Sequence, residues 1–279
     1  MPNENGIGRF SFSASAAGLS ASLTNPVKRV DAKGESVLQA CGGYSADKVG
    51  EFHIEEIVRV KSMSTQVSGI RSKAGAWETL ATSTVEGVDI LGIVKADRIV
   101  ARVTQRFPFK GGDPTVSFFG SHFEGLTIAG KPIELPSDNA VAGDGPSAEI
   151  PQALASSHRD FAECLKALSS KDDKIVERLR NYVPYLSNGG GSDKPGAVRT
   201  VVGSLASNYQ FDADDCRRCG HVIFVPNFGV IVLAEFLVNG DSISITMLQA
   251  DLGSPVEGQV CLSSGRTGGS PMPPPSPNA

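Results

Sequence analysis

Apolar and polar residues alternate along several stretches of the first half of the chain, which is the period of a strand with one buried face. A loose alternation over residues 10–14 predicts one strand, followed by irregular structure up to residue 50. Residues 51–61 keep the alternation except at Glu56 and Ile57, so we predict a single half-buried strand there. The pattern therefore favours a β protein.

Two longer strands are predicted where valine and isoleucine are most concentrated. Residues 82–91 and 94–106 are joined around the LGIV segment, and β-branched residues favour strands over helices. A helix would collect the apolar residues of this region only loosely on one face. In the strand interpretation, three residues face inward: Ile99, Ala101 and Val103.

Glycine and proline divide the segment that follows. Residues 115–136 predict two or three short strands cut by Gly120, Gly125 and an AGKP turn. Farther along, apolar runs flank Asn239 and Gly240, and an Asn-Gly pair accepts the positive φ angles of a type I′ turn. We therefore predict a β-hairpin centred on this pair.

These patterns divide the chain into four parts. Residues 1–135 form a first β-rich part, and residues 151–186, with apolar residues three and four positions apart, predict an inserted helical hairpin. Residues 198–263 return to the strand pattern and complete the same domain, and residues 264–279 predict a disordered tail. The fold class is mainly β, a large β-sandwich or barrel with an inserted helical hairpin.

Charge and hydropathy exclude several partners. The formal net charge is −4 and the 26 basic residues are scattered, so no nucleic acid is expected. The longest apolar run, residues 229–238, is too short for a membrane-spanning helix and contains Glu235, so no membrane span is expected.

No secretory leader is recognisable. The expected location is the cytoplasm by default, or the cell surface if a leader is missing or export is non-classical.

Five cysteines in so long a chain do not indicate a disulfide-dense scaffold. Cys216 and Cys219 have CxxC spacing, and His221 or the distant Cys261 would complete a tetrahedral zinc site. The two arginines between the cysteines would instead favour thiolates and a redox-sensitive pair. The remaining alternative is a pair of reduced thiols in a surface turn. Zinc is the one cofactor that the sequence suggests, through Cys216, Cys219 and His221.

Acid/base chemistry has two candidate sources. His122 and Glu124 are two residues apart and so share one face of a strand, although a solvated strand face explains the same spacing. Glu235 lies in apolar surroundings, where a carboxylate is paired, raised in pKa or turned to solvent, and Arg98 and Arg102 are candidate partners. If the chain is an enzyme, its catalytic residues are His122, Glu124 and Glu235, provided that they converge in one pocket.

The segment STVEGVDILGIVKADRIVARV (residues 83–103), followed by FFGSHFEGLTIAGKPI (residues 118–133), resembles the choice-of-anchor P family of bacterial surface proteins. That family has a strand pair of similar pattern followed by a glycine-containing hairpin. The resemblance implies a β-rich surface or envelope module. It implies no catalytic residues, so none is transferred to this chain.

Three functions remain open at this level. The first is a non-catalytic structural or binding module of bacterial surface type, whose partner is another protein or a second copy of itself in a homo-oligomer. This reading is favoured because no catalytic motif is complete. The second is a β-barrel isomerase, cyclase or hydrolase that uses the His/Glu pair. The third is a zinc-stabilised or redox-sensitive module at the CxxC.

Overall fold

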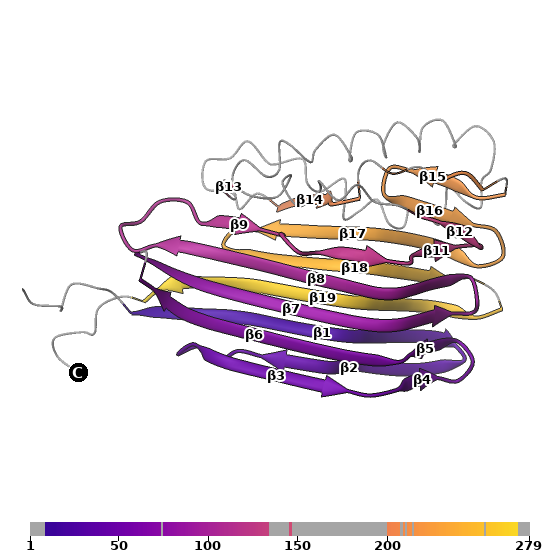
Figure 1. Ribbon diagram of the computed structural model, residues 1–279, viewed down its shortest axis with the longest axis horizontal. Coiled ribbons are helices and arrows are strands. Elements are labelled where there is room, and N and C mark those ends of the chain that lie inside the picture. Colours follow the sequence, from indigo (N-terminus) through magenta and orange to yellow (C-terminus); the bar gives the residue numbers. More distant parts are fainter. Residues whose placement is uncertain are drawn as a thin grey trace, which may run out of the picture.

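The computed structural model describes most of the chain outside residues 147–199. The described ranges are 9–73, 75–133, 145–146, 200–206, 209, 211–213, 215–253 and 255–272. Within these ranges every regular element is a β-strand (Figure 1). No helix in them is long and apolar enough to cross a membrane. The helical hairpin expected at residues 151–186 lies outside the described residues.

The first of two antiparallel sheets, sheet A, combines both ends of the chain. Its strand order is β15-β16-β17-β18-β19-β1-β2, and β14 pairs with β17 beside β16. The strands are β1 (Phe10–Asn25), β2 (Val27–Val37), β14 (Thr200–Ser204), β15 (Arg217–Cys219), β16 (Val222–Val225), β17 (Gly229–Asn239), β18 (Ser242–Leu252) and β19 (Glu257–Pro271).

The second sheet, sheet B, comes from the middle of the sequence. Its four main strands lie in the order β3-β6-β7-β8, and short strands extend it at both sides. The main strands are β3 (Gly43–Val49), β6 (Ser62–Ser72), β7 (Ala76–Ile90) and β8 (Val94–Pro108). The short strands are β4 (Phe52–Ile54), β5 (Val58–Val60), β9 (Thr115–Ser117), β10 (His122–Glu124), β11 (Thr127–Ile128), β12 (Lys131–Pro132) and β13 (Gly145–Pro146).

The two sheets pack face to face, with β1 against β6 and β7, and β19 against β7 and β8. Their Cα atoms approach within 8 Å at these strands, closer than the ~10 Å usual for stacked sheets. Small residues allow this approach. A Cβ atom on Gly265 would lie 3.4 Å from Ala81 Cβ and from a Val103 methyl group, and one on Gly18 would lie 2.9 Å from Met63. Both sheets are open, so the sandwich alternative is confirmed and the barrel alternative is wrong.

Buried serines join the sheets by hydrogen bonds to the backbone. The hydroxyl of Ser263 on β19 accepts a hydrogen bond from the Ala101 amide of β8 and donates one to the Ser83 carbonyl of β7, both at 2.9 Å. Ser83 in turn donates to the Ala17 carbonyl of β1 at 2.9 Å. These contacts tie β19 to the paired residues Ser83 and Ala101 of sheet B, and tie β7 to β1 of sheet A.

The strand pair predicted from valine and isoleucine is confirmed. Residues 82–91 and 94–106 lie within β7 and β8, which pair with each other from Ala76 to Ile90. The three residues expected to face inward are fully buried. They are Ile99, Ala101 and Val103.

The single strand predicted at residues 51–61 is wrong. This stretch forms a hairpin of β4 and β5, and the break in the alternation at Glu56 and Ile57 is its turn, which Glu55 enters with a φ of 48°. The irregular structure predicted up to residue 50 is also wrong, because β2 and β3 occupy most of that stretch. Their exposed sheet-edge residues obscure the alternation.

The boundary of the predicted tail is wrong as well. Residues 264–271 are the second half of β19, hydrogen-bonded to β1 along their whole length. Glycine and threonine in this stretch resemble a linker in composition, yet Gly265 and Thr267 are buried where the sheets come close.

The β17–β18 hairpin is confirmed, but its central residues are Gly240 and Asp241, one position later than predicted.

The first and last strands of the described chain lie side by side. Phe10 at the start of β1 pairs with Pro271 at the end of β19, and β2 lies on the other side of β1. In Figure 1 the indigo β1 accordingly runs beside the yellow β19. The N-terminal and C-terminal β-rich parts therefore share one sheet.

Candidate functional site

Outward side chains on sheet B form rows that cross the strands, because antiparallel partners in register point to the same side. The rows are largely polar, as expected for the solvated face of a half-buried sheet. Successive rows are Tyr44, Ser68, Leu80, Thr104 and Ser117; Ala46, Gln66, Thr82 and Arg102; Lys48, Ser64, Thr84, Val100 and His122; and Ser62, Glu86, Arg98 and Glu124.

The predicted His122–Glu124 pair lies in a charged network on this face. His122 Nε2 is 3.0 Å from Glu124 Oε1, and Arg98 donates to Glu124 at 3.4 Å and to Glu86 at 2.8 Å. The hydrogen bond with His122 is the main reason that the pKa of Glu124 is lowered. Hydrogen bonds from Arg98 and then Ser62 lower the pKa of Glu86. The network is half-exposed and its charged groups are paired with one another, which suits a stabilised surface.

Glu235 does not join this network. Its neighbour Phe236 points into the core, where its ring lies 5.0 Å from that of Phe118 on the sheet B side. Glu235 therefore points to the outer face of sheet A, and its Oε2 lies 3.5 Å from Nε2 of the buried His221. The three candidate catalytic residues thus lie on opposite outer faces of the sandwich. Arg98, one of the partners expected for Glu235, is engaged by Glu86 and Glu124 instead.

The two cysteines of the CxxC are in different states. Cys219 is buried and disulfide-bonded, whereas Cys216 is a free thiol whose pKa is raised by burial and by Asp215. Cys261 is also free. No group of three or more histidine, cysteine or acidic residues in the described ranges is arranged to hold a metal ion. The predicted zinc ligands Cys216, Cys219 and His221 are near in sequence but do not form such a group.

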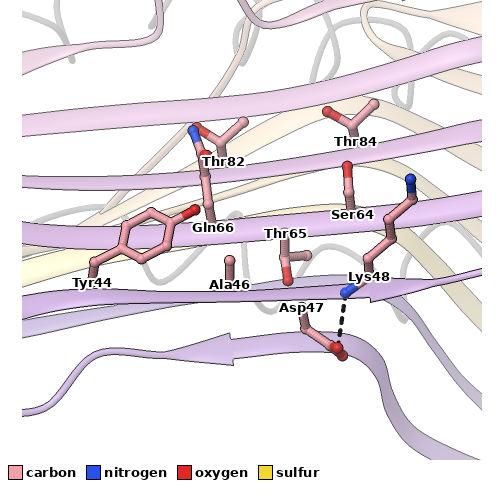
Figure 2. Close-up of a pocket in the computed structure, with 9 residues that line it drawn as sticks. All are labelled: Tyr44, Ala46, Asp47, Lys48, Ser64, Thr65, Gln66, Thr82 and Thr84. Atoms are coloured by element: carbon pink, nitrogen blue, oxygen red, sulfur yellow. Dashed lines mark hydrogen bonds between the residues drawn. The ribbon is translucent and has the colours of Figure 1, made fainter.

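A groove on the outer face of sheet B, which we call the tyrosine groove, crosses β3, β6 and β7 (Figure 2). Tyr44 stands at one end and Lys48 at the other, with Gln66 between them. The groove measures about 460 Å³, within the range of small-ligand sites. It is lined by Tyr44, Ala46, Asp47, Lys48, Ser64, Thr65, Gln66, Thr82 and Thr84.

Polar groups of the tyrosine groove are available to a ligand. Among the described residues, the side chains of Tyr44, Ser64, Gln66 and Thr84 have no hydrogen-bond partner. The hydroxyl of Thr82 is covered and likewise has no partner in the described part of the chain. Hydroxyl and amide groups that are free to donate and accept are suited to a ligand that is itself rich in hydroxyl groups.

A second hollow, the arginine groove, lies across β7, β8 and β9. Arg106 donates a hydrogen bond to Glu78 at 2.9 Å, so the positive charge of Arg106 is balanced by the Glu78 carboxylate. The guanidinium of Arg102 has neither a hydrogen bond nor an ion pair with any residue that the structure describes. The groove measures about 420 Å³ and is lined by Glu78, Arg102, Thr104, Arg106, Thr115, Val116, Ser117 and Phe119.

Residues 10–239 match the family model described as Domain of unknown function (DUF8256). The chain belongs to this family. No curated protein and no solved structure matches it. The DUF8256 match begins at the first residue of β1 and ends at the last residue of β17, so it includes both grooves but not β18 and β19.

Sequence reasoning missed both grooves of this DUF8256 protein. Tyr44 and Gln66 belong to strands whose pairing is set by the fold, and the row that joins Gln66, Thr82 and Arg102 requires the register of three strands. The only local signal was the polar half of each alternating strand. The spacing of His122 and Glu124, in contrast, indicated correctly that they share a face.

Proposed function

We propose that this DUF8256 protein is a non-catalytic binding module of bacterial surface type, which holds a glycan chain on the outer face of sheet B. The resemblance to choice-of-anchor P proteins supports this setting, since residues 83–103 and 118–133 supply much of β7, all but the end of β8, and β10 to β12. The disulfide at Cys219 also supports it, because disulfides persist mainly in oxidising compartments outside the cytoplasm.

The observation that carries the proposal is the unsatisfied polar lining of the tyrosine groove. Ser64, Gln66 and Thr84 offer donors and acceptors from two adjacent strands, with Ser64 and Thr84 in register across a spacing of about 4.8 Å. Tyr44 is a residue 68% exposed, and its ring has an apolar face for a sugar and a hydroxyl for a hydrogen bond. This combination is the chemistry of carbohydrate recognition.

The placement of the charged residues favours binding over catalysis. General acid/base catalysis needs two groups within reach of one substrate. His122 and Glu124 lie on the outer face of sheet B and Glu235 on that of sheet A, so one substrate cannot meet all three. Glu124 is also engaged by Arg98.

The test is a glycan array probed with the full chain, followed by calorimetry on the glycans that bind. The double variant Tyr44→Ala, Gln66→Ala should weaken binding by about tenfold or more, because it removes the ring and a hydrogen-bonding amide. Ser244→Ala with Thr246→Ala, on the outer face of sheet A, is the matched control and should bind like the parent. Either an array without any bound glycan or an undiminished affinity in the groove variant overturns the proposal.

A further inference from the structure

We propose that the arginine groove is a subsite for a sugar carboxylate, so that the glycan held on sheet B is an acidic polysaccharide containing hexuronate residues. This inference rests on the proposed function and specifies its ligand. It comes from the pairing of the three arginines of β8, from the exposed Phe119 in the same groove as Arg102, and from the nearness of the two grooves.

Arg102 differs from the other arginines of β8 in having no carboxylate partner among the described residues. Arg98 contacts Glu86 and Glu124, and Arg106 contacts Glu78. A guanidinium can bind a carboxylate through two parallel hydrogen bonds, and Arg102 has its guanidinium unengaged by any described residue. Arg102 therefore offers one unused positive charge in a groove whose other charges are balanced, which matches a ligand with one negative charge per site.

Phe119 is an exposed aromatic residue in the same groove as Arg102. The adjacent Phe118 is buried against Phe236, which leaves the Phe119 ring 62% exposed. The turn that follows is tied to β8, because the Ser121 hydroxyl accepts from the Arg102 amide at 2.8 Å and donates to the Arg102 carbonyl at 2.9 Å. An aromatic face next to a guanidinium can hold a sugar ring and its carboxylate together.

Hydroxyl groups complete the subsite. Thr104, Thr115 and Ser117 line the same groove, where they can meet the hydroxyls of a sugar ring. Phosphate or sulfate groups would also attract Arg102, but Glu78 lies in the groove and neutralises Arg106. The low net charge therefore favours a carboxylate over a group of higher charge density.

The two grooves are neighbours that meet along one row of the sheet. Thr82 pairs with Gln66 of the tyrosine groove on one side and with Arg102 of the arginine groove on the other. From β3 to β9 the face spans four strand spacings, roughly 19 Å. A ligand that reaches both grooves is therefore a chain of several linked sugars that lies across the strands.

The experiment compares polygalacturonate with its fully methyl-esterified form, because esterification removes the charge and keeps the sugar backbone. We expect the full chain to bind polygalacturonate more tightly, and Arg102→Gln to weaken that binding by about tenfold or more. Arg102→Lys should restore it only in part, because lysine lacks the planar fork. Arg266→Gln, which removes an exposed arginine from sheet A, is the matched control and should change nothing. An unchanged melting temperature in each variant shows that it is folded.

Three outcomes overturn the inference, and they are distinguishable from failure of the proposed function. If neutral glycans bind through Tyr44 while polygalacturonate does not, only the acidic subsite is wrong. The same holds if Arg102→Gln binds polygalacturonate like the parent. Tighter binding of heparin that is lost in Arg102→Gln would assign the groove to sulfate. Absence of binding to every glycan, charged or neutral, would overturn both proposals.

Discussion

Asp251 illustrates how the position of one side chain sets the response of the fold to pH. Its carboxyl group on β18 is largely removed from solvent, and this burial raises its pKa despite hydrogen bonds from Gln259 and Gln249. Glu235 adds a further negative charge nearby. Protonation of Asp251 is therefore favoured in the folded state relative to the unfolded state.

Asp251→Asn should raise the melting temperature at pH 7 to 8. An acidic group whose pKa is raised in the folded state stabilises the fold below its unfolded-state pKa. This stabilisation is lost as the pH rises through the folded-state pKa, so the ionised Asp251 carboxylate is unfavourable for folding at neutral pH. The gain should vanish near pH 3, where both proteins carry a neutral side chain. Thermal melts at both pH values measure this, with Asp241→Asn in the exposed β17–β18 turn as a control that should not change. Equal melting temperatures at pH 8 would contradict the assignment.

Residue spacing predicted only those contacts that a single strand determines. His122 and Glu124 meet because alternate residues of a strand share a side. The surroundings of Arg102 and Gln66 depend on which strands become neighbours, and local alternation does not carry that information. The two cysteines show another limit of residue spacing. The CxxC pattern places Cys216 and Cys219 close in the chain, but it does not determine whether each thiol is free or disulfide-bonded.

At the level of elements, Ser263 links β19 to β7 and β8. Ser263→Ala should lower the free energy of unfolding by about 2 kcal/mol, because it removes two buried hydrogen bonds, to the Ala101 amide and the Ser83 carbonyl. Urea denaturation followed by circular dichroism measures this loss. Ser22→Ala, at an exposed position of β1, is the control and should change the stability little. A loss no larger than that of the control would mean that the serine does not join the sheets.

Some strands were predictable and others were not, for reasons of burial. β7 and β8 have an alternating, strongly apolar inward face, so their pattern is unambiguous. β2 and β3 are edge strands with mostly exposed residues, and the end of β19 is made of glycine, serine and threonine. These small residues are buried where the sheets come unusually close, a circumstance that composition alone cannot reveal.

For the whole molecule, β19 is the strand that completes sheet A between β1 and β18. A chain ending at residue 263 should fail to unfold cooperatively, because it loses the pairing of residues 264–271 with both neighbours. A chain ending at residue 272 should melt like the full-length protein. Thermal melts followed by near-ultraviolet and far-ultraviolet circular dichroism compare the two. A cooperative melt of the shorter chain would show that residues 264–271 are dispensable, as a disordered tail would be.

The mainly β class followed from the number of predicted strands, but the choice between sandwich and barrel and the assignment of strands to sheets did not. Sheet A joins β1 and β2 to strands from the opposite end of the sequence, and sheet B takes the segment between them. Pairings of this kind depend on long-range packing, which a local pattern does not encode.

The adjacency of β1 and β19 also has a consequence for synthesis on the ribosome. β1 emerges before the other described strands, whereas β19, which covers one of its edges, begins about 230 residues later, on the order of ten to fifty seconds at ordinary rates of translation. β6, β7 and β8 can pair as successive hairpins during that interval, but one edge of β1 must wait. The nascent chain therefore exposes an apolar strand edge throughout that interval, and this is when it is most open to mispairing with another chain and most in need of a chaperone.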